Sequence, residues 1–350
     1  MTSQTSHDLT LADLGWSAFF MGQLTLEEFE TLRPLRLIAV ERDRATGLGP
    51  DGPITMTFPP TLPAGDTAVG DWVMVDPAAR RIARVLGRQS VIARKAAGTD
   101  NRQQLMAANV DTLFLVTSCN ADFNPARLER YLALALDAGV TPVVVLTKAD
   151  LADDPQDFVA RAAAVSPRIA DVVALDATDA AALAPLAPWL GRGQTIAFLG
   201  SSGVGKSTLV TGLTGDGIAT QPVREDDAKG RHTTTSRTLR RTVGGAMVID
   251  MPGMREIALQ DASTGIDELF DDILDLARRC RFRDCAHEAE PGCAVQAAVD
   301  GGDLDPARLG RWRKLRREDA LNSEARHERR SRERTFGRVV KEAIDLKRKG

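Results

Sequence analysis

The feature that most constrains the fold is a glycine-rich loop at residues 200–207, with the sequence Gly-Ser-Ser-Gly-Val-Gly-Lys-Ser. The apolar run at residues 195–199 predicts a buried strand before the loop, and the residues from Ser207 onward predict a helix after it. Glycines permit the tight turn that points backbone N–H groups at phosphate oxygens, and a helix N-terminus favours the same anion. The pattern therefore predicts an α/β sheet that binds a nucleotide phosphate at the end of one strand.

Individual residues of this loop have expected roles. Lys206 is expected to reach the β- and γ-phosphates, and the Ser207 hydroxyl to bind Mg²⁺. A chance glycine-rich turn is the alternative, and the strand before it and the helix after it argue against that. The residues expected to contact the nucleotide are Gly200, Ser201, Ser202, Gly203, Val204, Gly205, Lys206, Ser207 and Thr208.

A second motif, Thr-Lys-Ala-Asp at residues 147–150, follows an apolar run at residues 141–146 that is typical of a parallel strand. The Asp150 carboxylate can accept hydrogen bonds from guanine N1–H and N2–H₂, a pair of donors that adenine lacks. The aliphatic stem of Lys148 can lie along the purine. Most guanine-nucleotide-binding proteins have Asn in place of Thr147, so one hydrogen bond near the base is expected to differ.

The order of the two motifs is unusual. In most guanine-nucleotide-binding domains the phosphate loop comes first and the base-reading motif follows it, whereas here residues 147–150 precede residues 200–207. We interpret this order as a circular permutation of the domain. A further strand-like run at residues 171–175 leads into Asp176, where a Ser is usual, so the second base-contacting loop is a weak match.

Two polar stretches after the phosphate loop complete the expected site. Residues 230–235, Gly-Arg-His-Thr-Thr-Thr, have the position of a loop that senses the γ-phosphate. We expect Thr234 to complete the Mg²⁺ shell, with either neighbouring threonine as the alternative. Asp250 ends an apolar run and is expected to hold Mg²⁺ through water, while the N–H of Gly253 is expected to meet the γ-phosphate.

The catalytic residues expected here are His232, Lys206 and Thr234. Met254 stands where many such enzymes place a Gln that orients the attacking water, and a thioether cannot do this. His232 is the nearest polar candidate, since an imidazole can position or deprotonate water. The alternative is that His232 only packs or contacts RNA.

Cys280, Cys285, His287 and Cys293 lie within a short stretch that contains three of the four cysteines of the chain. Three thiolates and one imidazole are the ligands of a closed, tetrahedral, structural zinc site. Three cysteines would leave one unpaired in a disulfide arrangement, which argues against disulfides. The fourth, Cys119, ends a separate apolar strand and is interpreted as a core thiol.

The length and composition of the chain indicate how many domains it has and where in the cell it acts. A chain of 350 residues is long enough for two or three domains, and no apolar run approaches the roughly 20 residues that span a membrane. The first eight residues lack a basic segment followed by an apolar one, so no signal peptide is expected. We therefore expect a cytoplasmic protein with reduced thiols that acts as a monomer and binds no membrane.

Residues 306–350 form a strongly basic tail, with 16 Lys and Arg against 7 Asp and Glu, a balance of +9 in a chain of net charge −3. Such a segment is a candidate contact for nucleic-acid phosphates, with a solvated charged helix as the alternative. Helical spacing predicts an apolar face in each half of it, made of Leu309, Trp312, Leu315, Ala320 and Leu321, and of Val339, Val340 and Ile344.

The N-terminal part reads as short helices followed by strands. Residues 8–33 predict one or two helices anchored by Trp16, Phe19 and Phe20, and a capping pattern at Thr25 begins one of them. Five β-like runs with Pro and Gly turns then predict a small oligonucleotide-binding barrel, at residues 36–40, 54–58, 70–75, 81–86 and 90–95. Four basic residues favour RNA binding there over a purely structural barrel, namely Arg84, Arg88, Arg94 and Lys95.

Together these motifs, in this order, resemble the circularly permuted GTPases that act on the small ribosomal subunit, the RsgA (YjeQ) family. The resemblance runs from about residue 35 to the end. It departs from the family pattern at Asp176 and in the N-terminal helical segment. The matching residues are those at 147–150, 200–207, 230–235 and 250–253, with Cys280, Cys285, His287 and Cys293.

The resemblance implies an α/β fold, a circularly permuted P-loop GTPase domain with an N-terminal OB-type barrel and a C-terminal zinc-containing helical domain. It implies hydrolysis of GTP to GDP and phosphate, stimulated by the small (30S) ribosomal subunit in its late assembly, to time release. The implied cofactors are one structural Zn²⁺ and Mg²⁺ with GTP, and the implied partners are that subunit and its 16S rRNA.

The expected domains are a helical segment at residues 1–34, an OB-fold RNA-binding domain at 35–97, the permuted GTPase domain at 98–262 and a zinc-binding basic helical domain at 263–350. Two other functions stay open. One is a structural rRNA-binding checkpoint in which GTP occupancy matters more than turnover. The other is a P-loop kinase or ATPase, against which Asp150 and the Asp250 motif argue.

Overall fold

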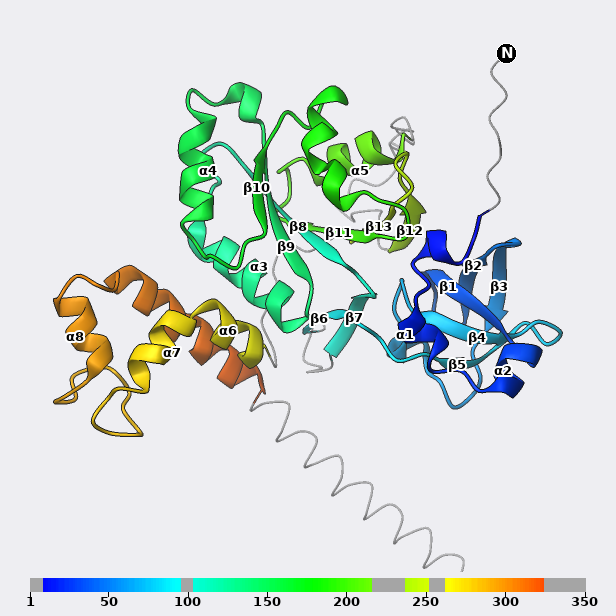
Figure 1. Cartoon of the computed structure of the whole chain (residues 1–350), viewed down its shortest axis with the longest axis horizontal. Coiled ribbons are helices and arrows are strands. Elements are labelled where there is room, and N and C mark those ends of the chain that lie inside the picture. Colours follow the sequence, from blue (N-terminus) through cyan, green and yellow to red (C-terminus); the bar gives the residue numbers. More distant parts are fainter. Residues whose placement is uncertain (1–8, 96–102, 216–236, 252–261, 324–350) are drawn as a thin grey trace, which may run out of the picture. The chain divides into compact units, whose positions relative to one another are not determined.

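The structure is a computed structural model that describes residues 9–95, 103–215, 237–251 and 262–323 (Figure 1). The chain divides into two compact units, the first made of Met1–Ala93 and Leu105–Glu256, the second of Arg94–Gln104 and Ile257–Gly350. In the parts of the chain that are described, no helix combines the length and the apolar composition needed to cross a bilayer.

The first unit begins with three short helices, η1 (Ala12–Leu14), α1 (Ala18–Met21) and α2 (Leu26–Thr31). The predicted cap of α2 is confirmed as a capping box, in which Thr25 Oγ1 accepts from the Glu28 N–H and the Glu28 carboxylate accepts from the Thr25 N–H. Phe20 is buried as expected, whereas Phe19 is 44% exposed. Phe19 is therefore an exposed apolar residue and not an anchor.

Five strands close into a barrel with the strand order β1-β2-β3-β5-β4, the small barrel that the sequence predicts. The strand predicted at residues 90–95 is confirmed, but its place in the barrel is wrong. Residues 91–95 form β6 (Val91–Lys95), which pairs with β7 (Gln103–Ala108) outside the barrel. The barrel strands are β1 (Arg33–Val40), β2 (Arg44–Gly49), β3 (Gly52–Thr57), β4 (Trp72–Asp76) and β5 (Arg81–Val85).

The strand that the sequence did not predict is β2, which contains two glycines and has little β propensity. Packing explains why it is there. A Cβ on Gly47 would lie 2.6 Å from the terminal methyl of Met56, and a Cβ on Gly49 would lie 2.6 Å from a methyl of Leu35. The packing of Leu35 and Met56 therefore leaves no room for a side chain at Gly47 and Gly49 unless these two side chains move.

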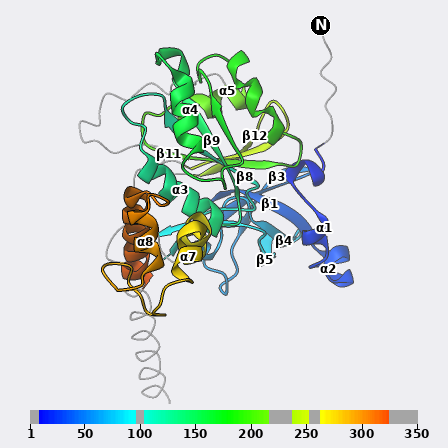
Figure 2. The same ribbon diagram turned by 60° about the vertical axis from the view of Figure 1, so that its left-hand side comes forward.

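The second part of the first unit is a six-stranded sheet with the order β10-β9-β8-β11-β13-β12 (Figures 1 and 2). All neighbours are parallel except β12, which runs antiparallel to β13. Strands β8 and β9 precede β11 in sequence by many residues, yet β8 pairs directly with β11 and β9 pairs with β8, which is the permuted arrangement. The strands are β8 (Thr112–Ser118), β9 (Thr141–Thr147), β10 (Asp171–Ala174), β11 (Thr195–Gly200), β12 (Thr238–Arg241) and β13 (Met247–Asp250).

Helices cover this sheet and bury its apolar strands. Helices α3 (Pro125–Asp137) and α4 (Pro155–Ala163) pack against β8, β9 and β10 (Figure 1). Helix α5 (Lys206–Thr214) packs against β11 and the 3-10 helix η4 (Ala181–Trp189). A core cluster that includes Phe114, Phe198 and Leu209 joins α5 and η4 to the sheet. Burial on both faces explains why the strands read as continuous apolar runs.

A buried arginine joins the N-terminal helices, the barrel and the sheet within the first unit. Arg36 is 1% exposed, and its guanidinium donates to the carbonyls of Leu14, of Gly70 (3.3 Å) and of Asn109 (2.8 Å). Burial lowers the pKa of Arg36 to about 10, partly opposed by the charges of Asp111 and Asp71. The side chain therefore keeps its charge at neutral pH, and three segments depend on it for their hydrogen bonds.

From Ala262 onward the described part of the second unit contains helices and no strand, with α6 (Ser263–Leu269), α7 (Asp271–Ala277), α8 (Ala294–Asp300) and a helix at residues 306–323. Leu309, Trp312 and Leu315 are buried as predicted. Ala320 and Leu321 are exposed, contrary to the prediction, and the buried stripe continues instead at Asp319, which accepts a hydrogen bond from the Ala262 N–H at 2.9 Å. Helical spacing from Leu315 leads to position 319, not to 320 or 321.

Candidate functional site

The phosphate loop connects β11 to α5, as the sequence predicts. Gly203 and Gly205 have φ angles of +81° and +91°, a backbone conformation that residues with a Cβ rarely adopt. Gly200 lies beside Val116 of β8, and a Cβ there would come within 2.2 Å of the Val116 carbonyl oxygen. These three glycines are therefore needed for the turn itself and for its close approach to the neighbouring strand.

Lys206 lies inside the loop. Its Nζ donates to the carbonyl of Gly200 at 2.6 Å and to that of Ser201. Burial lowers the pKa of Lys206, and the nearby Asp250 carboxylate opposes this effect. The ammonium is thus held by the same backbone whose N–H groups are expected to bind phosphate.

The guanine motif is bonded directly to this loop through Thr147, the last residue of β9. Thr147 is fully buried, and its Oγ1 lies 2.7 Å from the carbonyl oxygen of Val204 in the loop and 3.2 Å from that of Thr117 in β8. A hydroxyl has one proton to donate, so the shorter contact is the main hydrogen bond. Thr147 therefore joins the expected base site to the phosphate loop, across 57 residues of sequence.

The residues after Thr147 turn sharply toward the same edge of the sheet. Lys148 adopts a left-handed φ of +57°, and a short 3-10 helix, η3 (Ala149–Leu151), follows. Asp150 is exposed, which leaves its carboxylate accessible to a ligand. Parallel strands β8, β9 and β11 end together, so this motif and the phosphate loop lie at one edge of the sheet.

The loop after β10 has its own local order. Asp176 accepts hydrogen bonds from the hydroxyl of Thr178 at 2.7 Å and from its N–H at 2.8 Å, and these bonds lower the pKa of Asp176. The Ala149 N–H donates to the carbonyl of Leu175 at 3.3 Å, which connects this loop to the guanine motif. The loop therefore lies beside the expected base site although its sequence is a poor match.

Asp250 ends β13, the strand next to β11. Burial raises the pKa of Asp250, and the charges of Arg240 and Lys206 lower it in part. Asp250 and Lys206 therefore lie close enough to interact, as a site built around phosphate and Mg²⁺ requires. Ser207 is exposed at the start of α5. Four other predicted residues, His232, Thr234, Gly253 and Met254, lie outside the described residues.

A contact that the sequence did not predict supports the phosphate loop from α3. Arg127 donates to the Ser201 hydroxyl, and its guanidinium lies 3.1 Å from both carboxylate oxygens of Asp122. Tyr131, one turn further along the helix, also hydrogen-bonds Ser201. The sequence signalled only that a helix begins here, because Asn124 caps it and a proline follows.

In the second unit the three cysteines and the histidine meet at one point. The ligand atoms of Cys280, Cys285, His287 and Cys293 all lie within 4.8 Å of one another. The Cys280 and Cys293 sulfurs are 3.9 Å apart, and each lies 3.5 Å from His287 Nδ1. A tetrahedral zinc would place two thiolates about 3.8 Å apart and a thiolate about 3.6 Å from an imidazole nitrogen. The group can therefore hold one zinc ion.

Neighbouring side chains fix the conformation of this cluster. His287 has a left-handed φ of +59°, a strained conformation for a residue with a Cβ, and both Gln296 and Arg313 donate to its carbonyl. Glu290 accepts from several backbone N–H groups of the loop between the ligands, its own and that of Ala286 first, and these lower its pKa to about 2. The ligands are thus positioned by groups that no zinc motif would have indicated.

Two barrel arginines that favoured RNA binding have other partners. Arg84 forms a two-pronged ion pair with Glu28 of α2, at 2.5 and 3.0 Å, and Arg88 forms one with the buried Asp71, at 2.6 and 2.8 Å. Arg84 holds α2 to the barrel, Arg88 holds the segment after β5 to the segment before β4, and both guanidinium groups are engaged by carboxylates. Arg94 hydrogen-bonds Gln104 at 3.2 Å, and the side chain of Lys95 is outside the described residues.

Comparisons with known proteins identify one family. A model of the RsgA GTPase family matches residues 85–260. The small ribosomal subunit biogenesis GTPase RsgA of Mesorhizobium japonicum is 52% identical over 323 residues, covering 91% of this chain and 92% of that protein. The RsgA 2 protein of Vibrio vulnificus is 45% identical over 350 residues, covering 100% and 99%.

Two solved structures share the fold. The structure of YjeQ from Thermotoga maritima superposes with a TM-score of 0.58 at 23% identity, covering 81% of this chain and 97% of that one. The circularly permuted GTPase YloQ superposes with a TM-score of 0.56 at 22% identity, covering 81% and 93%. With its permuted sheet, its bonded pair of nucleotide motifs and its near full-length relatives, the chain belongs to the RsgA GTPase family.

Proposed function

We propose that this chain is a GTPase stimulated by the small (30S) ribosomal subunit, which acts late in the assembly of that subunit and hydrolyses GTP to GDP and phosphate to time its own release. The observation that carries the proposal is the hydrogen bond from Thr147 to Val204, because it makes the guanine motif and the phosphate loop parts of one site. The names of the relatives, small ribosomal subunit biogenesis GTPase, support the same activity and partner.

In this proposal guanine is read by Asp150, whose exposed carboxylate accepts from N1–H and N2–H₂, while the stem of Lys148 lies along the base. The backbone N–H groups of residues 200–208 bind the α- and β-phosphates, and Lys206 extends to the β- and γ-phosphates. Gly253 contributes its N–H to the γ-phosphate. The described residues among these lie at the carboxyl ends of β9 and β11, two strands of one sheet separated only by β8.

Hydrolysis would use a Mg²⁺ held by Ser207 and Thr234, with Asp250 acting through water. When bound, this ion neutralises charge on the β- and γ-phosphates. This role for Asp250 is supported by its position at the end of β13, where its carboxylate interacts with Lys206 of the phosphate loop. His232 is proposed to orient the attacking water, since Met254 offers no group that could do so.

The second unit is proposed to bind RNA. One structural Zn²⁺ on Cys280, Cys285, His287 and Cys293 would keep its loop rigid, and the excess positive charge of residues 306–350 would contact phosphates of 16S rRNA. We propose that the chain acts as a monomer in the cytoplasm, where the small subunit is assembled and cysteines stay reduced.

The permuted order fits release on hydrolysis. The γ-phosphate-sensing residues Thr234 and Gly253 come shortly before the first helix of the second unit, which begins at Ser263. A change at these residues on loss of the γ-phosphate has a short covalent path to the zinc-binding unit. If the second unit keeps one orientation relative to the sheet in both the GTP-analogue and the GDP complexes, this coupling is wrong.

The direct test is GTP hydrolysis with and without purified small ribosomal subunits, at low and moderate salt, with ATP as the control nucleotide. We expect strong stimulation that is specific for GTP and that weakens as salt is raised, because rRNA contacts are salt-dependent. Guanine-nucleotide binding without stimulation would refute subunit-stimulated hydrolysis and favour a checkpoint role in which occupancy alone matters.

Two variants separate the remaining alternatives. Asp150→Asn exchanges the acceptor that reads N1–H, so nucleotide preference should move from guanine toward xanthine, whereas a general P-loop ATPase would show no such change. Lys206→Ala should abolish turnover while leaving binding to the subunit through the second unit in place. Loss of subunit binding on Lys206→Ala would instead mean that docking depends on the nucleotide.

A further inference from the structure

The N-terminal helices leave an apolar surface that nothing in the nucleotide site requires. It consists of Phe19, Met21, Leu26 and Phe29, whose side chains are 44, 52, 86 and 61% exposed. The four lie within eleven residues: Met21 and Phe29 line one pocket and Leu26 lies one helical turn before Phe29, whereas the other exposed large apolar residues of the described chain stand singly in the sequence. Patches of this kind mark interaction sites far more often than isolated exposed residues do.

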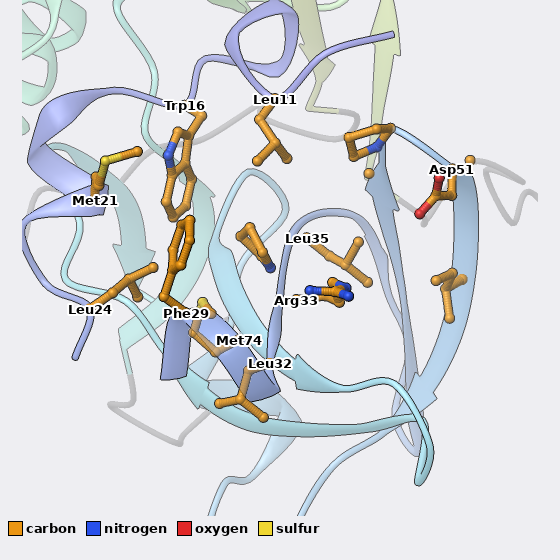
Figure 3. A pocket seen from close by; sticks show the side chains of 15 residues that line it. Leu11, Trp16, Met21, Leu24, Phe29, Leu32, Arg33, Leu35, Asp51 and Met74 are labelled. Carbon is orange, nitrogen blue, oxygen red and sulfur yellow. The ribbon is translucent and has the colours of Figure 1, made fainter. Parts of the chain in front are cut away.

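A pocket of about 440 Å³ opens beside this surface, between the N-terminal helices and the barrel (Figure 3). Its lining is almost wholly apolar. In Figure 3 the rings of Trp16 and Phe29 form one wall, and Met74 of β4 and Leu35 of β1 line the pocket deeper in the barrel. The volume is within the range of about 300–1,000 Å³ that is usual for binding pockets, so it can receive one or two large apolar side chains.

The pocket is held open by polar contacts that fix α2 on the barrel. The capping box fixes the first turn of the helix, and Glu28 is also the partner of Arg84 in β5. Gln23 exchanges two hydrogen bonds with the backbone of Gly87, at 2.6 and 3.2 Å. The apolar side chains therefore face solvent from a positioned helix, which reduces the ordering that a bound partner would have to impose.

The charges around the pocket indicate what kind of partner fits. Glu27 and Glu30 lie on α2, the helix that carries Phe29, but outside the pocket lining, and Asp51 lines the pocket from the turn between β2 and β3. None of these three carboxylates forms an ion pair within the described residues, and Arg33 is the one cation in the lining. An excess of negative charge repels RNA phosphates and attracts a basic partner.

We propose that this pocket, together with the apolar surface, binds a protein segment of the small ribosomal subunit in which an aliphatic or aromatic side chain is flanked by Lys or Arg. The proposal rests on the proposed function for the identity of the particle. The apolar side chain enters the pocket against the wall formed by Trp16 and Phe29, and the basic side chains meet Asp51 in the lining and the charge of Glu27 and Glu30 on α2. The surface thereby adds a protein contact to the RNA contacts proposed for the second unit.

The test compares binding of full-length variants to purified small subunits in the presence of a non-hydrolysable GTP analogue. Phe29→Ser and Leu26→Ser should each weaken binding about tenfold, as expected for loss of a central apolar contact. Val243→Ser is the matched control, because Val243 is 78% exposed in the turn between β12 and β13 and should tolerate the same change without effect. Thermal unfolding verifies that each variant is folded.

The sign of a charge effect separates a basic protein partner from RNA. The double variant Glu27→Gln, Glu30→Gln should weaken binding about threefold if the partner is basic. If this surface faces RNA, the same variant removes repulsion and binding becomes tighter, which would overturn the proposal. Unchanged binding in every variant, with the wild type bound, would overturn it while leaving the proposed function intact, whereas no binding by the wild type would overturn both.

A photo-crosslinking amino acid at position 29 identifies the occupant. We expect a crosslink to a Lys- or Arg-containing segment of a ribosomal protein, found by mass spectrometry of the bound complex. A crosslink to rRNA, or to the basic residues 324–350 of the same chain, would overturn the proposal. In the second case the pocket would be closed from within the molecule.

Discussion

Replacing Thr147 with Val tests whether the two nucleotide motifs work as one site. The change keeps the shape of the side chain and removes its hydroxyl. In the structure Oγ1 lies 2.7 Å from the carbonyl oxygen of Val204, in a fully buried position. The variant therefore loses one short hydrogen bond and leaves a loop carbonyl without that donor.

The size of the effect follows from burial. Leaving one buried polar group without its partner costs about 1–3 kcal/mol. Because Val204 belongs to the phosphate loop, we expect about 1–2 kcal/mol of this to appear as weaker nucleotide binding. At 1.4 kcal/mol for each factor of ten, the Kd for GDP should rise about fivefold to thirtyfold. The remainder of this free energy should appear as a lower unfolding temperature of the first unit.

The assay is a calorimetric titration of each variant with GDP and Mg²⁺. Thr195→Val is the matched control, since Thr195 is also a buried threonine of this sheet but its hydroxyl has no hydrogen-bond partner among the described residues. That variant should bind GDP as the wild type does and be at least as stable. Normal GDP affinity in Thr147→Val, or an equal loss in Thr195→Val, would refute the reasoning.

Three further changes test other parts of the structure. Arg127→Met removes the donor to Ser201, so the Kd for GDP should rise about threefold in the same titration, and no change would mean that α3 does not position the loop. Removing zinc by chelation, or changing Cys285 to Ser, should unfold helices of the second unit, seen as lost circular dichroism, while GDP binding persists because the nucleotide site lies in the first unit. Hydrogen bonds from Arg84 and then from a backbone N–H lower the pKa of Glu28 from 4.5 to about 2. Since the folded pKa is the lower one, its contribution to stability is complete above pH 4.5 and is lost as the pH falls toward 2. Melting temperatures between pH 5 and pH 3 should therefore fall less in Glu28→Gln than in the wild type, and equal falls would contradict this.

Much of the nucleotide-binding fold could be predicted because each motif follows a continuous apolar strand. Buried parallel strands have a distinctive composition, and their carboxyl ends must meet, so residues 147–150 and 200–207 could be brought together from the sequence. The zinc ligands were predictable for a related reason, since four residues of the right chemistry stand within a short span. Both features are local in the sequence and need particular residue types, so they can be recognised without knowing which distant residues they contact.

The failures concern interactions between distant residues. Strand β2 was not predicted because its glycines lower its β propensity. They are there because the side chains of Leu35 and Met56 pack against them across the barrel. In the sequence Arg84 and Arg88 favour RNA binding, because their carboxylate partners are 56 and 17 residues away and no local pattern indicates them. A charged side chain has the same appearance in a sequence whether it faces solvent or pairs with a distant carboxylate.

Permutation has a consequence for how the nucleotide site forms. Strand β11 carries the phosphate loop, and it is inserted between β8 and β13, one of which precedes it in the chain while the other follows. The Thr147 hydroxyl can reach Val204 only after β11 has paired with β8, because Thr147 and Thr117 lie at the ends of the adjacent strands β9 and β8. Strands β8 and β9, with the guanine motif, can therefore pair first. The nucleotide site is complete only after β11 has joined β8 and brought the phosphate loop beside that motif. Nucleotide binding should then stabilise the completely paired sheet, because a ligand that binds only this state shifts the folding equilibrium toward it.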